Sequence, residues 1–305
     1  ISGPLAGDPR MKTASNPNGD EVLGTLNNCS MGVTPWGTYL ACEENFHNYF
    51  VNRDEQDYAQ RPEHKRYGIG LNGSSRYYAW ESVEPRFNAT PDANQPHQGH
   101  VNEPNRFGWV VELDPFAPQS VPIKRTAMGR LGRECAVCSL SDDGRMAFYS
   151  GDDARGEYLY KFVPDGAYRP GEPDHNASLL DSGTLYAAQF KADGTGRWLP
   201  LRFGEPGLTA QHGFSDQQAV LLNSRGAADA AGATPMDRPE WVAVHPQTRE
   251  AYVTLTNNTD RGKAQPTDAA NPRSENLHGQ ILRWREAGAN PTAEEFEWDI
   301  FLLAG

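Results

Sequence analysis

The chain has 305 residues, of which 37% are hydrophobic, 10% aromatic and 22% charged, and this length and composition support a buried core. Its 40 acidic and 28 basic residues give a formal net charge of −12, which argues against a nucleic-acid partner because phosphates need a basic surface. No run of about 18 apolar residues occurs, so we expect no membrane span.

Short apolar or alternating runs recur along the chain and predict strands, whereas sustained helical periodicity is missing. The 30 glycines and 23 prolines favour many turns between them. In chain order the strand-like runs are "FGWVVELDPFAP" (107–118), "CAVCSLSDDGRMAFYSGDD" (135–153), "EYLYKFVPDGAY" (157–168), "GTLYAAQFKADGTGRWLPL" (183–201), "EWVAVHPQTREAYVTLTNN" (240–258), "GQILRWRE" (279–286) and "EFEWDIFLL" (295–303). Repeated units of short strands indicate an all-β fold, and a β-propeller more than a sandwich.

The segments between these units are polar. Residues 52–98 and 227–238 predict loops, and residues 207–233 are the one place where we expect helix, because "SDQQAVLL" resembles a capped helix start. No Ser/Gly-rich or Pro-rich linker interrupts the chain. We therefore predict a single domain over residues 1–305.

The stretch "GTLNNCSMGVTPWGTYLACEENFHNYF" (24–50) holds two of the four cysteines. Its Thr-Pro-Trp-Gly turn predicts a hairpin centred on residues 35–36, with Cys29 opposite Cys42. Strand alternation then places Cys42 and Glu44 on one face and Glu43 on the other. Three interpretations stay open: a disulfide, inert buried cysteines, and a metal site of thiolate and carboxylates for a transition metal or calcium.

Other candidate residues stand at predicted strand ends: Glu134, Asp152, Asp153, Arg238, Glu240 and Asn258. Carboxylates and amides suit cations, and an arginine suits a phosphate or a carboxylate. Each also has an ordinary interpretation, as a turn residue, a solvated strand start or a surface salt bridge. Cys135-x-x-Cys138 has no second cysteine pair or histidine cluster beside it, so we expect Cys138 to be core.

Six runs carry a resemblance to a known family. They are "GTLNNCSMGVTPWGTYLACEENFHNYF", "NRFGWVVELDPFAP", "PIKRTAMGRLGRE", "GDDARGEYLYKFV", "RPEWVAVHPQTREAYVTLTNN" and "NPRSENLHGQILRWRE", which together span nearly the whole chain. In these runs the chain resembles the PhoX-type bacterial alkaline phosphatases. The resemblance implies a six-bladed β-propeller, a monomer exported by the twin-arginine route to the periplasm or beyond, that hydrolyses small phosphate monoesters.

The same resemblance implies a cofactor of two ferric ions (Fe3+) bridged by a cysteine thiolate, with calcium ions (Ca2+) and an oxo group alongside. Cys29 matches the bridging cysteine. Glu134 and Glu240 match carboxylates at the iron site. Glu44, with Glu43 adjacent, matches a ligand on the calcium side.

Arg238 matches a phosphate-contacting arginine of the family. The remaining polar residues in matching motifs are Asn27, Asn28, Asp152, Asp153 and Asn258, and all of them except Asn27 are expected at the metal site. The chain departs from the family where Arg133-Glu134-Cys135 replaces His-Glu-Gly, a change that places a cation and a thiol beside a ligand.

Family members are also about twice as long, so the chain is expected to cover only part of the propeller, starting near the second blade and stopping before a further acidic stretch. Two other functions stay open. One is a non-catalytic calcium-binding propeller that serves as a binding or structural module, and the other is a calcium-only hydrolase of diesters or lactones.

Overall fold

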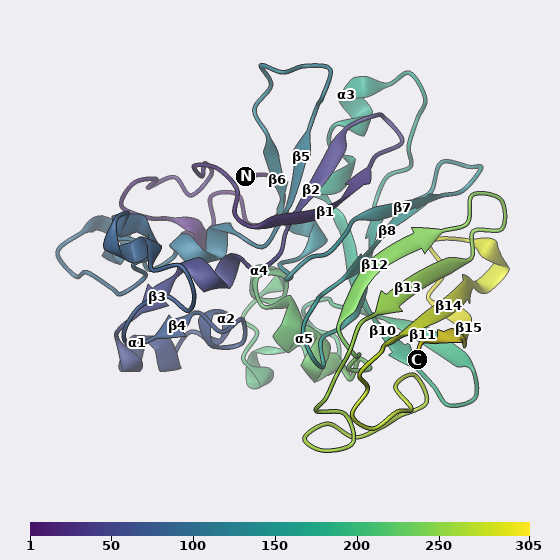
Figure 1. Ribbon diagram of the computed structural model, residues 1–305. Coiled ribbons are helices and arrows are strands. Elements are labelled where there is room, and N and C mark those ends of the chain that lie inside the picture. Colours follow the sequence, from purple (N-terminus) through teal and green to yellow (C-terminus); the bar gives the residue numbers. More distant parts are fainter.

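The computed structural model describes residues 1–305, and most of its regular structure is β-strand (Figure 1). Three antiparallel meanders of four strands follow one another along the chain. The first contains β1 (Asn28–Val33), β2 (Tyr39–Glu43), β5 (Val110–Leu113) and β6 (Ile123–Arg125). The second contains β7 (Val137–Leu140), β8 (Met146–Gly151), β9 (Leu159–Pro164) and β10 (Gly183–Phe190). The third contains β12 (Pro239–Val244), β13 (Ala251–Leu255), β14 (Gln280–Glu286) and β15 (Glu295–Leu303).

One more strand, β11 (Thr195–Pro200), joins the second and third meanders into a nine-stranded sheet. It pairs with β10 on one side and with β15 on the other. The sheet curls back on itself, so that its two end strands, β7 and β12, contact each other. Every strand-like run of the sequence is therefore confirmed, and the meanders lie side by side through their first strands as neighbouring propeller blades do.

The helices are short. The α-helices are α1 (Glu55–Ala59), α2 (Pro62–Lys65), α3 (Pro173–Asn176), α4 (Gln217–Leu222) and α5 (Ser224–Ala231), and a parallel strand pair joins β3 (Val51–Asn52) to β4 (Gly70–Leu71). The 3-10 turns are η1 (Pro9–Met11), η2 (Phe46–Tyr49), η3 (Trp80–Ser82), η4 (Pro85–Phe87), η5 (Pro96–Gln98), η6 (Glu103–Arg106), η7 (Thr126–Met128), η8 (Leu179–Asp181), η9 (Ala210–His212) and η10 (Ala287–Ala289). No helix has the length and apolar character that a membrane crossing requires.

The helix expected within residues 207–233 is confirmed as α4 and α5. The Asp216 side chain caps α4 by accepting a hydrogen bond from the Ala219 amide at 2.7 Å. The loop expected over 227–238 is wrong in part, because α5 runs on to Ala231 through alanines, which have the highest helix propensity. The loop expected over 52–98 is also wrong in part, because it contains α1 and α2.

The second meander is a central layer with both faces buried. Met146 and Phe148 of β8 face a core shared with the first meander, α4 and α5, whereas Ala147 and Tyr149 face a core shared with the third meander. Because successive side chains of a strand point to opposite faces, a strand covered on both sides needs a continuous apolar run. This explains "MAFY" in the sequence.

Neighbouring meanders approach each other closely at two seams, where β1 lies against the start of β7 and the end of β8 lies against β12. A methyl group on Gly32 of β1 would lie 1.8 Å from the Ala136 carbonyl oxygen, just before β7, and one on Gly151 would lie 2.3 Å from the Glu240 carbonyl oxygen in β12. Glycine is therefore required at both seams. The seams set the spacing of the three meanders.

Gly32→Ala should destabilise the fold by about 3 kcal/mol, because the added methyl group must push β1 away from β7. Urea denaturation of this variant against Val33→Ala, a truncation of an exposed side chain on the same strand, measures the effect. Equal unfolding midpoints for the two variants would show that the seam does not require glycine at position 32.

Candidate metal centre

Three strand starts converge on one point of the molecule. Cys29 is the second residue of β1, Glu134 precedes β7 by three residues, and Glu240 is the second residue of β12. Figure 1 shows β1, β7 and β12 side by side in the middle of the molecule, as their contacts require. Residues far apart in sequence are thus brought to a common edge.

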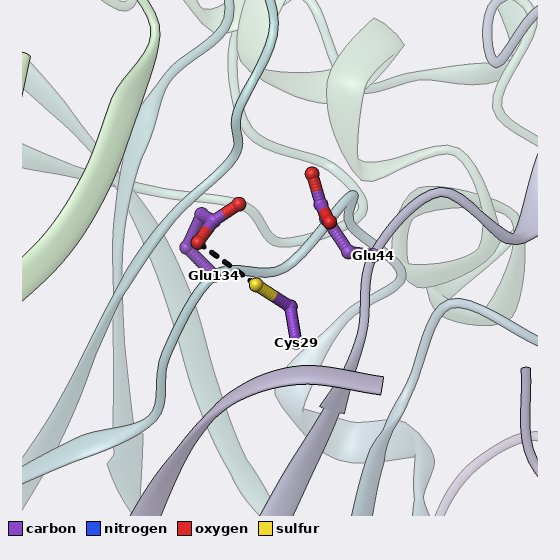
Figure 2. Close-up of side chains that lie close together, drawn as sticks. All are labelled: Cys29, Glu44 and Glu134. Atoms are coloured by element: carbon purple, nitrogen blue, oxygen red, sulfur yellow. Dashed lines mark hydrogen bonds between the residues drawn. The ribbon is translucent and has the colours of Figure 1, made fainter. Parts of the chain in front are cut away.

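Cys29, Glu44 and Glu134 form the centre of this edge. The Cys29 Sγ lies 3.2 Å from Oε2 of Glu134, and one ligand atom from each of the three residues lies within 4.8 Å of the others. Figure 2 shows Glu134 and Glu44 on opposite sides of the Cys29 sulfur. One thiol and two carboxylates at this separation can hold a metal ion.

A β-bulge directs Cys29 to this position. The expected pairing of Cys29 with Cys42 is wrong, because the register of β1 and β2 shifts between Asn28↔Glu43 and Met31↔Ala41. A bulge re-aims the side chains within it. Cys29 is exposed while Cys42 is fully buried in the core, and both are free thiols. The disulfide interpretation is therefore wrong for this structure, and Cys42 is a packing residue.

Burial and mutual repulsion raise the pKa values of these groups. Burial and the neighbouring Glu44 raise the pKa of Glu134 from 4.5 to about 8. Burial and the hydrogen-bonded Glu134 raise the pKa of Cys29 to about 12. Burial also raises the pKa of Glu44, and Asp153 adds to the rise. A cation at the centre would remove the repulsion that holds these protons.

Arg238 lies beside this acidic centre. Its Nε and Nη2 donate to the two oxygens of Asp153 at 2.9 and 2.8 Å, and Nη2 lies 3.6 Å from Oε1 of Glu240. Burial, and then Asp153, raise the pKa of Glu240. Arg238 has a φ of +57°, which L-residues rarely adopt, at the start of a β12 segment whose register is irregular. This backbone directs the guanidinium toward the acids.

Two of the expected metal ligands are instead anchored in the interior. Glu43 points away from the centre, because its carboxylate accepts from Lys124 Nζ at 2.8 Å and from the amides of Leu26, Gly108 and Trp109. The Asp152 carboxylate is fully buried in a two-bonded pair with Arg225. The expectation that these two residues bind metal is corrected accordingly.

The expected asparagine ligands also have other partners. The Asn258 side chain is buried between Asp237, Gln265 and the amide of Asp260, so the structure does not bring it to the centre. Asn28 lies at the edge itself, where its Oδ1 accepts from the Thr25 hydroxyl at 2.6 Å. Asn27 braces the loop of Glu44, whose amide donates to the Asn27 carbonyl at 3.0 Å.

The two residues that depart from the family pattern, Arg133 and Cys135, have their partners in the interior. Arg133 is buried and donates to the carbonyls of Met128 and Gly129, and the Cys135 sulfur accepts from the Val242 amide at 3.3 Å. Extended backbone alternates its side chains, so Glu134 alone faces the site. The added cation and thiol lie in the interior.

Sequence reasoning missed Arg225 and Lys124, which neutralise the two inward-facing acids. Arg225 stands in "NSRGAAD", a helix start in which an arginine between small residues looks solvent-exposed. It is 6% exposed. The signal was the helix prediction itself, since a helix start packed on the sheet must bury one side.

Comparison with known proteins gives one family and one structure. The family model for alkaline phosphatase PhoX matches residues 1–305. A similar solved structure is Pseudomonas fluorescens PhoX in complex with vanadate, a transition state analogue, with 47% identity and a TM-score of 0.91. The match covers 100% of this chain and 52% of that one, so the chain spans about half the length of the relative. A search of curated proteins found no match.

The raised pKa of Glu134 predicts a pH dependence of stability in the metal-free protein. The folded pKa of about 8 exceeds the ordinary 4.5, so folding retains a proton that the unfolded chain releases. The stabilisation is complete below about pH 4.5 and is lost as the pH rises through about 8, by about 1–2 kcal/mol after allowance for solvent screening.

Glu134→Gln should flatten this pH dependence, and Glu275→Gln, at an exposed ion pair with Lys263, should not. The measurement is urea denaturation from pH 5 to pH 9 with chelator present. A wild-type stability that stays level between pH 5 and pH 8 would contradict the prediction.

Proposed function

The chain belongs to the PhoX alkaline phosphatase family, and from this we propose that it is part of a metal-dependent phosphatase that hydrolyses phosphate monoesters. The observation that carries the proposal is the cluster of Cys29, Glu44 and Glu134 at the meeting point of the meanders. The relative solved with vanadate supports it, because vanadate imitates the transition state of phosphoryl transfer and such analogues bind where the reaction occurs.

The donor atoms fit the metals that the family implies. A thiolate and carboxylates suit a transition metal such as iron, and carboxylate oxygens suit calcium. We propose that Cys29, Glu134 and Glu240 would hold the ferric ions and that Glu44 would hold calcium. Asp153 and Asn28 would contribute further oxygens. When bound, these cations would supply Lewis-acid stabilisation of the charge on the phosphoryl group.

Arg238 has the role of binding the phosphate. Its Nε and Nη2 are engaged by Asp153, which fixes the plane of the guanidinium and leaves Nη1 free for an oxygen of the ester. A fixed positive charge beside the phosphate stabilises charge that develops during transfer and requires little reorganisation. Asp153 therefore orients Arg238, and Arg238 orients the substrate.

Other features of the whole protein belong to the same proposal. The three meanders would be half of a six-bladed propeller that forms a single domain, since the relative is about twice as long. The protein would be a monomer, exported by the twin-arginine route to the periplasm or secreted, acting on small phosphate esters.

Cys29→Ala in the full-length protein should abolish both iron binding and hydrolysis of p-nitrophenyl phosphate at alkaline pH with calcium, because it removes the only thiolate at the centre. Cys138→Ala, at a partly buried thiol away from the centre, should retain both. Elemental analysis should find iron near two per wild-type chain. Calcium without iron would instead favour a binding module or a calcium-only hydrolase.

Arg238→Lys should lower kcat/KM for p-nitrophenyl phosphate about 100-fold while the metal content stays unchanged, because lysine keeps the charge but not the forked geometry. The matched control is Arg283→Lys, at an exposed arginine with the same two-bonded geometry to Asp299 on the outer strands. Equal activities of the two variants would exclude a phosphate-binding role.

A further inference from the structure

A buried ion pair lies directly behind the proposed metal site. Arg225 of α5 donates from Nε to Asp152 Oδ2 at 2.8 Å and from Nη2 to Oδ1 at 2.5 Å. The two side chains are 7% and 0% exposed. The Arg225 guanidinium also lies over the Tyr67 ring, 4.9 Å from its centre. The orientation of the Asp152 carboxylate is thus fixed from α5.

The Asp152 carboxylate also holds the backbone two residues before Glu134. Its Oδ1 accepts from the Gly132 amide at 3.2 Å. A methyl group on Gly132 would lie 2.9 Å from both that oxygen and Arg225 Nη2, so the backbone, the carboxylate and the guanidinium are in close contact. Two residues later the Glu134 amide donates to the Gly151 carbonyl at 3.1 Å.

The same ion pair also holds the segment that carries Asp153. The Asp153 amide donates to the Gly132 carbonyl at 3.1 Å, and Asp153 binds Arg238 through both carboxylate oxygens. The segments that carry Glu134 and Asp153 are therefore joined to each other, and the Asp152–Arg225 pair ties both to α5. Ligand groups must be held to within about 0.5 Å for a metal site to work.

We propose that Asp152 and Arg225 are positioning residues for the metal site: they touch neither metal nor substrate, and they fix Glu134 and Asp153 in the geometry that binds the cations. This rests on the proposed function. It also explains why Asp152, which lies next to Asp153 in sequence, is not available as a ligand. A partner of this kind behind a metal ligand commonly changes metal affinity 10–100-fold.

The test compares apparent iron affinity, measured by competition with a chelator, in full-length wild type, Asp152→Asn, Arg225→Lys and the double variant. We expect each single variant to bind iron 10–100-fold more weakly and the double variant to bind no more weakly than the singles. Asp152→Asn retains an oxygen for the Gly132 amide and is the milder change. Circular dichroism verifies folding.

The matched control is Glu112→Gln, which removes one charge from the buried Glu112–Arg125 pair in the first meander. An iron affinity within twofold of wild type in both single variants would overturn the proposal, as would an equal loss in the control. Additive losses in the double variant would show that Asp152 acts independently of Arg225, which also overturns it. Wild type that binds iron without hydrolysing esters would refute the proposed function alone, since affinity is the readout here.

Discussion

The close packing of β1, β7 and β12 forces a thiol and several carboxylates into a space that their own charges disfavour. At both seams a glycine lets one backbone approach the next: Gly32 of β1 lies against Ala136 before β7, and Gly151 at the end of β8 lies against Glu240 of β12. The acidic groups stand at the starts of these strands, so their separation is set by backbone contacts. Burial, and then the closeness of Glu44 that this spacing imposes, raise the pKa of Glu134.

Two pairs of adjacent acids divide their roles in the same way. In Glu43–Glu44 the first carboxylate is buried against Lys124, and in Asp152–Asp153 the first is buried against Arg225. The second member of each pair faces the site. Alternation of side chains along extended backbone produces this division, and each inward acid has a buried cation, because an unpaired buried charge is costly. The inward acid then anchors the segment that presents the outward one.

Local pattern predicted much of this molecule, and tertiary contact decided the rest. The apolar runs, the Thr-Pro-Trp-Gly hairpin and the capped helix at Asp216 are local signals, and all appear in the structure. Alternation along the strand already predicts that Glu43 and Glu44 point to opposite faces, so only one of them can face the metal site. The bulge at Cys29 and the partner of Asp152 depend on strands and a helix that lie far away in sequence, and no local pattern reports them.

Either protons or the proposed cations can relieve the electrostatic repulsion among the acidic groups of the centre. Without a cation, the raised pKa values of Cys29 and Glu134 favour their neutral forms, so these two groups contribute no ionic attraction to the site. A cation displaces those protons and is then attracted by the ionised thiolate and carboxylates. Contacts outside the centre therefore hold the framework in place. The glycine seams and the inward-facing acid pairs are contacts of that kind, since neither depends on the charge state of the groups that they position.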